Sequence, residues 1–131
     1  MEEQKLTYNI IDYTEYPGPR YRQQGVDSGE AFYEDKLKGL FEEVLRKSEI
    51  SKTKITLEVN LDNTAGYASS FLDEAFGNLS YDFGADIVKA HLRIVSEQEP
   101  DWVDVIMDET IPEWQEKKNL GTPRKPKFAN E

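Results

Sequence analysis

The sequence predicts an α/β domain, and three observations lead to that class. Residues 54–61 alternate strictly between apolar and polar side chains, which is the period of a β-strand with one buried face. Residues 28–47 place their apolar side chains on one helical stripe. The order strand, helix then repeats as far as residue 96. A chain of 131 residues fits one domain with a core of its own.

The first elements are predicted from periodicity and turn chemistry. Residues 5–13 carry apolar side chains at alternate positions and predict a strand. Pro17-Gly18 suits the two central positions of a type II turn, so we expect a hairpin back through residues 20–23. Asp27 precedes Glu30 at capping-box spacing, which predicts that a helix over 28–47 begins there.

The second half repeats the pattern. A loop over 62–66 leads to a helix that opens at Ser69 or Ser70, and a short helix and a strand over 92–96 follow. Pro100 can open a last helix, because proline lacks only an N–H that the first turn does not use. Pro112 should kink or interrupt that helix near Ile111.

Charge divides the chain into an acidic body and a basic end. Residues 1–116 hold 11 Lys/Arg against 25 Asp/Glu, whereas residues 117–131 hold 5 against 1. We predict one domain over 1–118 and a flexible basic tail over 119–131. An acidic surface repels phosphate backbones, so no direct nucleic-acid binding by the folded domain is expected. Ordinary solubility explains the charge more readily than a dedicated electrostatic role does.

Several function classes lack the residues that they need. The chain has no cysteine, no phosphate-binding glycine motif and no apolar run near the roughly 18 residues that span a bilayer. We therefore expect a cytoplasmic protein with no cofactor and no membrane association. His91 is the single histidine, which predicts a structural or surface role and no metal site. Ser69 and Ser70 lack the Gly-x-Ser-x-Gly elbow of a hydrolase nucleophile.

Two pairs of polar residues allow more than one interpretation. Ser69 and Ser70 can cap the helix that they open, or they can be presented to an enzyme as phosphate acceptors. Arg20 and Arg22 lie on one side of the predicted hairpin strand, where they can clamp an anionic group or pair with nearby carboxylates.

Three segments resemble the STAS-like domain family of unknown function, named for its similarity to sulphate-transporter and anti-sigma-factor-antagonist domains. They are residues 25–32, the strand 54–61 and residues 69–79. In anti-sigma-factor antagonists the comparable helix start reads Asp-Ser-Ser-Gly-Leu, and a kinase phosphorylates its second serine. The motif aligns with residues 68–72, with Ala68 in place of the aspartate and Phe71 in place of the glycine.

The resemblance implies a small mixed β-sheet with helices packed mainly on one face. It also implies a non-enzymatic, regulatory protein-interaction module, with Ser70, and next to it Ser69, as the candidate phosphoacceptor. The implied partner is another protein, such as a histidine-kinase-like ATPase. The residues expected to bind that partner surround the helix start: Asp62, Asn63, Phe71, Asp73 and Glu74.

One alternative function starts from the last predicted helix. Residues 97–116 contain eight acidic side chains and no basic one. Such a helix could occupy the basic groove of a target, as a small acidic inhibitor or a nucleic-acid mimic does.

Overall fold

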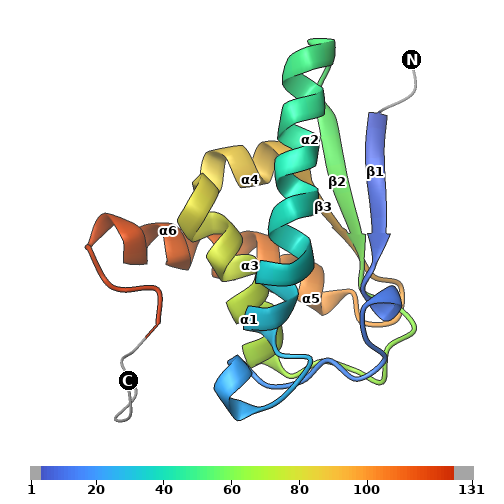
Figure 1. The fold of residues 1–131 in the computed structure, drawn as a ribbon, viewed down its shortest axis with the longest axis vertical. Coiled ribbons are helices and arrows are strands. Elements are labelled where there is room, and N and C mark those ends of the chain that lie inside the picture. Colours follow the sequence, from blue (N-terminus) through green and yellow to red (C-terminus); the bar gives the residue numbers. More distant parts are fainter. Residues whose placement is uncertain (1–3, 126–131) are drawn as a thin grey trace.

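Three parallel strands form a sheet in the computed structural model, which describes residues 4–125 (Figure 1). The strands are β1 (Gln4–Asn9), β2 (Ile55–Asn60) and β3 (Leu92–Val95), in the spatial order β1-β2-β3. Helical segments connect them, so the predicted α/β class is confirmed.

The helices lie on one side of the sheet (Figure 1). Each crossover steps in the same direction, from β1 to β2 and from β2 to β3. Right-handed crossovers that step in one direction place their helices on one face, which accounts for the one-sided cover. The connecting and flanking segments are η1 (Ile10–Asp12), η2 (Arg22–Gln24), α1 (Gly29–Phe32), η3 (Tyr33–Leu37), α2 (Lys38–Ser51), α3 (Ser69–Phe83), α4 (Ala85–His91), α5 (Asp101–Asp104), η4 (Val105–Thr110) and α6 (Ile111–Asn119).

The expected mixed sheet is wrong in one respect, because both strand pairings are parallel. The hairpin strand over 20–23 does not form, and Arg22–Gln24 is a short 3-10 turn. The backbone of this segment bonds to the start of α1 instead: Gly29 N–H donates to Pro19 O and Glu30 N–H to Arg20 O. These bonds hold the segment against the start of α1 and not against β1.

The predicted helix over 28–47 is helical from Gly29 to Ser51, with a π-helical turn at η3. Its N-cap is Ser28, not Asp27: Ser28 Oγ accepts the Ala31 N–H at 3.0 Å. Asp27 has a left-handed φ of 56°, and its carboxylate accepts a bond from the Thr14 hydroxyl. The capping residue therefore lies one position later than predicted.

Pro112 leaves the last helix continuous from Asp101 to Asn119. The six residues of η4 just before Ile111 form a π-helical turn, and Pro112 lies at the first turn of α6. The wider turn replaces the predicted interruption, and the buried Ser80 hydroxyl donates to Ile111 O at 2.7 Å. Proline is thus accommodated by a change of helix type.

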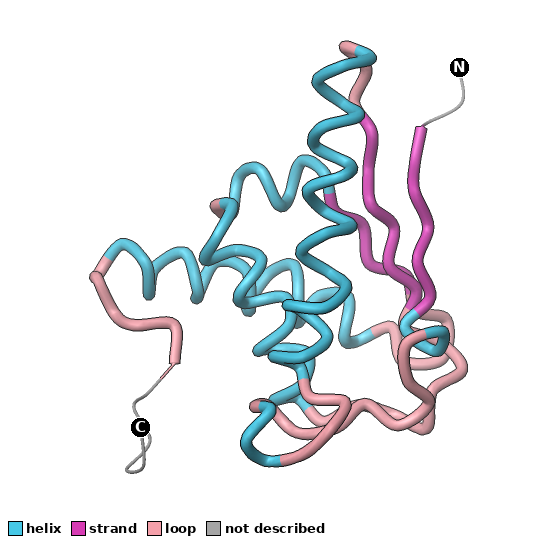
Figure 2. The backbone as a smooth tube through the Cα atoms, viewed as in Figure 1, coloured by secondary structure: helices cyan, strands magenta, loops and turns pink. Residues whose placement is uncertain are grey.

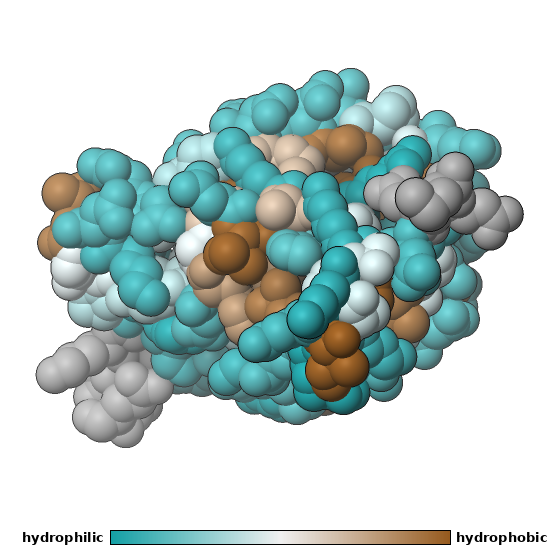
Figure 3. Space-filling model, turned by 90° about the horizontal axis from the view of Figure 1, so that it is seen from above, coloured by the Kyte–Doolittle hydropathy of each residue, from teal (hydrophilic) through white to brown (hydrophobic). Residues whose placement is uncertain are grey.

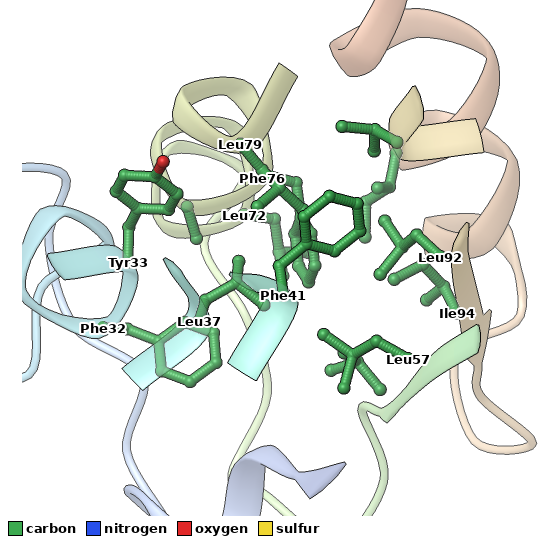
Figure 4. Packing of buried hydrophobic residues seen from close by; sticks show 14 of the residues in the cluster. Phe32, Tyr33, Leu37, Phe41, Leu57, Leu72, Phe76, Leu79, Leu92 and Ile94 are labelled. Carbon is green, nitrogen blue, oxygen red and sulfur yellow. The ribbon is translucent and has the colours of Figure 1, made fainter. Parts of the chain in front are cut away.

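The core lies between the covered face of the sheet and the helices (Figure 4). Leu57 from β2 and Leu92 and Ile94 from β3 point toward Phe41 of α2 and Phe76 of α3. All of these side chains are buried, which fits the strict alternation read in residues 54–61. Among the described residues, the buried apolar side chains of the sheet and of the helices form one continuous core cluster.

The other face of the sheet carries polar side chains. Glu58, at the centre of β2, lies 3.3 Å from Lys5 Nζ and 3.7 Å from Arg93 Nε. The face of the molecule in Figure 3 is likewise mostly hydrophilic, with separated apolar spots. Among the described residues the large exposed apolar side chains are scattered singly: Tyr16, Val26, Ile50, Ile87 and Leu120.

Candidate functional site

The loops that follow the strands gather at one end of the sheet (Figure 2). Asp62, just after β2, fixes this end by accepting N–H bonds from Glu97 at 2.9 Å and Gln98 at 3.0 Å. The Ser96 hydroxyl adds a third bond at 3.0 Å. The Glu97 and Gln98 amides and the Ser96 hydroxyl lower the pKa of Asp62 below its ordinary value, against a smaller effect of burial. Asp62 thus ties the loop after β2 to the loop after β3.

Asn63 is exposed and belongs to the same loop pair. Its N–H donates to the Gln98 side chain at 2.7 Å, and its own amide oxygen accepts from Gln98 Nε2 at 3.4 Å. Its φ of 74° is left-handed, a conformation that asparagine tolerates better than most residues. Asn63 therefore remains on the surface where the sequence placed it.

Ser69 and Ser70 are the first two residues of α3, so the predicted helix start is confirmed. The N-cap is Ala68, and no side chain caps this helix end. Ser69 is exposed and Ser70 partly exposed. Within residues 4–125 neither hydroxyl takes part in a hydrogen bond, so the capping interpretation of the two serines is wrong. The hydroxyls are left unused by the fold.

Aromatic side chains anchor the chain directly beside these serines. Phe71 is fully buried, with its ring 5.8 Å from that of Phe32 and 6.0 Å from that of Tyr67. The Tyr67 hydroxyl donates to Leu61 O at 2.7 Å, and burial raises its pKa to about 12. Phe71 and Tyr67 thus anchor the helix start in the core, while Ser69 is exposed and Ser70 is partly exposed.

Asp73 and Glu74 share one guanidinium. Arg20 Nη1 lies 2.7 Å from Asp73 Oδ2 and 3.3 Å from Glu74 Oε1. Glu74 is 1% exposed, and its second oxygen accepts from Asn78 Nδ2 at 2.7 Å. Burial raises the pKa of Glu74, and the bonds from Asn78 and Arg20 offset this only in part. Trp114 Nε1 donates to Asp73 at 3.1 Å.

The five residues expected to bind a partner therefore do not form one surface. Phe71 and Glu74 are buried, so in this conformation their side chains are not on the surface. Asp62 and Asp73 hold the fold together through both carboxylate oxygens. In the segment that leads into α3, Asn63, Ala65, Ala68 and Ser69 are exposed, and Asp62, Ser70 and Asp73 are partly exposed. Partner binding by these residues stays a prediction.

The other single residues have structural contacts. His91 Nδ1 lies 2.8 Å from Ile55 O, as its predicted structural role requires. Arg20 binds Asp73 and Glu74, and Arg22 binds Glu34 at 2.9 Å and Asp35 at 2.7 Å. Charge pairing, one of the two interpretations of these arginines, is confirmed for both.

A polar stripe on α3 was not predicted. Glu74, Asn78 and Asp82 recur at intervals of four residues along a helix that is otherwise largely buried. Arg20 binds one end of the stripe, and Arg124 binds the other through Asp82 and Asn78. The interval of four was a signal that could have been read, because it places all three side chains on one helical face.

The basic tail is described as far as residue 125, and residues 126–131 of that prediction lie outside the described residues. Arg124 and Lys125 contact α3 and α1, through Asp82 and Glu30. The flexibility of the tail stays a prediction.

The acidic residues of segment 97–116 are all exposed. Within the part of the chain that the structure describes, none of the eight forms an ion pair. This surface is available to a basic partner.

Neither a metal site nor a membrane span is found among residues 4–125. No cluster of three or more His, Asp or Glu side chains there could hold a metal ion. No helix in that range has the length and apolar content to cross a bilayer.

The arrangement described so far is a small α/β module with two unused hydroxyls at a helix start. Residues 28–102 match the family described as a STAS-like domain of unknown function. The match covers more than half of the chain, which therefore belongs to this family. Nothing among curated proteins or solved structures matches it.

Proposed function

We propose that the protein is a non-enzymatic interaction module of STAS type, regulated at Ser70. The observation that carries the proposal is the state of the helix start. Ser70 lies at the second position of a 15-residue helix and is partly exposed. Its hydroxyl forms no hydrogen bond within residues 4–125. A residue placed in this way can be modified without loss of a structural contact.

The local charges favour a phosphate at this position. A helix N-terminus stabilises negative charge through its free N–H groups and its dipole. Asp73 and Glu74, one turn later, oppose an added anion, but both already contact Arg20. In the proposed step a kinase-like ATPase transfers the γ-phosphoryl group of ATP to Ser70 Oγ, and ADP and the hydroxyl proton leave.

The modified helix start would then act on the partner by charge. About −1.5 to −2 charges would be added next to the exposed Ser69. A partner that contacts this end of the molecule would meet an anion where a neutral hydroxyl had been. We therefore expect phosphorylation to weaken binding.

The test begins with capture of a partner from native lysate and continues with titration of that partner. Ser70→Asp should weaken binding at least tenfold, about 1.4 kcal/mol. Ser70→Ala should bind as the wild type does. Ala90→Asp, which adds the same charge at an exposed residue of α4, beyond the other end of α3, is the matched control and should bind as the wild type does. Equal affinity of wild type and Ser70→Asp would contradict the proposal.

A second candidate function rests on the exposed acids of segment 97–116. Eight exposed carboxylates that form no ion pair within residues 4–125 would suit the basic groove of a target, as in an acidic inhibitor or nucleic-acid mimic. Binding of that kind should weaken steeply as ionic strength rises. A contact centred on the start of α3 should depend much less on salt.

A further inference from the structure

A guanidinium is bound on the surface of α3, close to its C-terminal end. We call residues 120–125 the C-terminal strap, because they turn back from α6 toward α3 (Figure 1). Arg124 of the strap forms a two-oxygen ion pair with Asp82, the geometry in which arginine recognises a carboxylate. Its Cζ also lies 4.8 Å from the centre of the Tyr81 ring. Asp82, Asn78 and Tyr81 form what we call the guanidinium site.

Asn78 shows that this site needs an occupant. The residue is 3% exposed, and its amide nitrogen is fully used by Glu74. Its Oδ1 accepts from Arg124 Nη1 at 3.4 Å, and the rest of the described chain supplies no other donor to it. A buried amide oxygen without a partner is costly. The fold thus presents an acceptor that the strap alone satisfies.

The remaining side chains preorganise the site. The hydroxyl of the buried Tyr33, the first residue of η3, donates to Asp82 Oδ2, the same oxygen that accepts from Arg124 Nη1, and so helps to fix the carboxylate. Burial acts to raise the pKa of Asp82, but the bonds from Arg124 and Tyr33 outweigh it, and the pKa is lowered. Asp82 is therefore charged and held in one orientation.

The strap itself is held loosely. Leu120 is 72% exposed, and residues 121–124 are also exposed, so no apolar burial anchors the segment. Its further polar contacts include bonds from Tyr81 Oη to Thr122 O and from Lys117 Nζ to Arg124 O, and a part-buried pair between Lys125 and Glu30. The bonds to Thr122 and Arg124 are exposed, and exposed polar contacts add little stability. A ligand that offers the same guanidinium and further contacts can replace the strap.

We propose that the guanidinium site is a docking site for an arginine-bearing basic segment of a partner protein, and that the chain's own strap occupies it until the partner binds. The acidic body of the protein attracts such a segment. The bidentate carboxylate and the ring of Tyr81 select arginine over lysine. The inference rests on the proposed interaction function for its partner, but it does not involve Ser70.

The test measures the fluorescence anisotropy of a labelled peptide with the sequence of residues 119–131. Full-length Arg124→Ala, in which the resident guanidinium is absent, should bind this peptide at least tenfold more tightly than the wild type does. Adding Asp82→Asn to that variant should remove the gain. Adding Glu49→Gln, a matched loss of one exposed carboxylate outside segment 97–116, should leave it unchanged. A peptide with lysine in place of its arginine should bind at least fivefold more weakly.

Folding of each variant is checked by its thermal melt. If the Asp82→Asn chain is unfolded, Tyr81→Leu on the Arg124→Ala background gives the same comparison, since it removes the ring and leaves the charges in place. Equal binding of the peptide by wild type and Arg124→Ala, or binding that survives both Asp82→Asn and Tyr81→Leu, would overturn the proposal. Neither result would touch the role of Ser70, which is measured with a different surface and a different ligand.

Discussion

At the scale of single residues, two helical glycines have opposite surroundings. A Cβ on Gly77 of α3 would lie 2.1 Å from Trp114 Cε2, whereas a Cβ on Gly39 of α2 would meet nothing within 4 Å. Trp114 cannot easily move, because it is 4% exposed and bonded to Asp73. We predict that Gly77→Ala lowers the free energy of unfolding by about 1–3 kcal/mol. Urea melts measure the loss.

Gly39→Ala is the control for that substitution. Alanine restricts the unfolded chain and favours helix, so the variant should gain about 0.5–1 kcal/mol. Equal effects of the two substitutions would contradict the close packing of α3 against α6.

The helix start at Ala68 gives a second prediction at this scale. Ala68 has the extended conformation of an N-cap, with φ −84° and ψ 142°, but no side-chain oxygen. Ala68→Ser should therefore raise the free energy of unfolding by about 0.5–1 kcal/mol. The free energy of unfolding of Ser70→Ala should stay within about 0.5 kcal/mol of the wild-type value, because the Ser70 hydroxyl forms no hydrogen bond within residues 4–125. A larger loss for Ser70→Ala in denaturant melts would show that its hydroxyl does cap the helix.

The N-caps of the two helices show that a sequence predicts a helix start more reliably than it predicts the capping residue. Both predicted helix starts were located within one or two residues, yet both capping residues were misassigned. Ser28 and Ala68 are N-caps because their own backbone is extended while the next residue is helical. That change of backbone angle depends on neighbouring loops, and a run of several polar residues does not reveal where it falls.

At the scale of elements, the last helix gives a direct comparison of its two faces. Ile106 is fully buried in the π-helical turn, and Asp108 in the same turn is exposed. Ile106→Ala should cost about 2–5 kcal/mol through the cavity that it leaves. Asp108→Ala should stay within about 0.5 kcal/mol. Similar losses in a denaturant melt would mean that this helix faces the other way.

Pro17-Gly18 shows why the hairpin prediction failed at this scale. The predicted type II turn does not form, because Gly18 is not among the glycines with a positive φ. Gly18 N–H donates to Asp27 O at 2.8 Å, and a Cβ on Gly18 would lie 2.7 Å from Val26 O. The glycine is needed for this close approach to the segment before α1, and a Pro-Gly pair in a sequence does not distinguish a close approach from a turn.

At the scale of the whole molecule, the hydrophobic periodicity of the sequence was enough to predict the α/β fold class and the one-sided helical cover of the sheet. It was enough because buried positions repeat regularly in strands and in helices. The polar stripe of α3 depends on Arg20 and Arg124, which approach it from opposite ends of the sequence. Both arginines lie outside residues 28–102, the range that matches the family. The sequence of α3 alone could not predict these two arginine partners, although the spacing of its polar residues at intervals of four could be read from it.

The stripe also predicts how stability depends on pH. The folded pKa of Asp82 lies below its ordinary value of 3.8, so the folded state binds its proton more weakly than the unfolded state does. The stabilisation from this carboxylate is complete above 3.8 and is lost as the pH falls through the folded pKa. Glu74 acts in the opposite direction: its folded pKa lies above 4.5, so protonation near and below that value favours the folded state.

The prediction is a difference between two chains that share every other carboxyl group. Asp82→Asn should have a lower free energy of unfolding than the wild type at about pH 7. This difference should become smaller as the pH falls below 3.8, because the wild type then loses the stabilisation from the charged Asp82 carboxylate, which the variant lacks at every pH. Glu74 and Asp62 titrate in both chains and cancel from the comparison. Urea unfolding at several pH values measures the difference, and a gap for Asp82→Asn that stays constant down to about pH 3 would contradict a lowered pKa at this carboxylate.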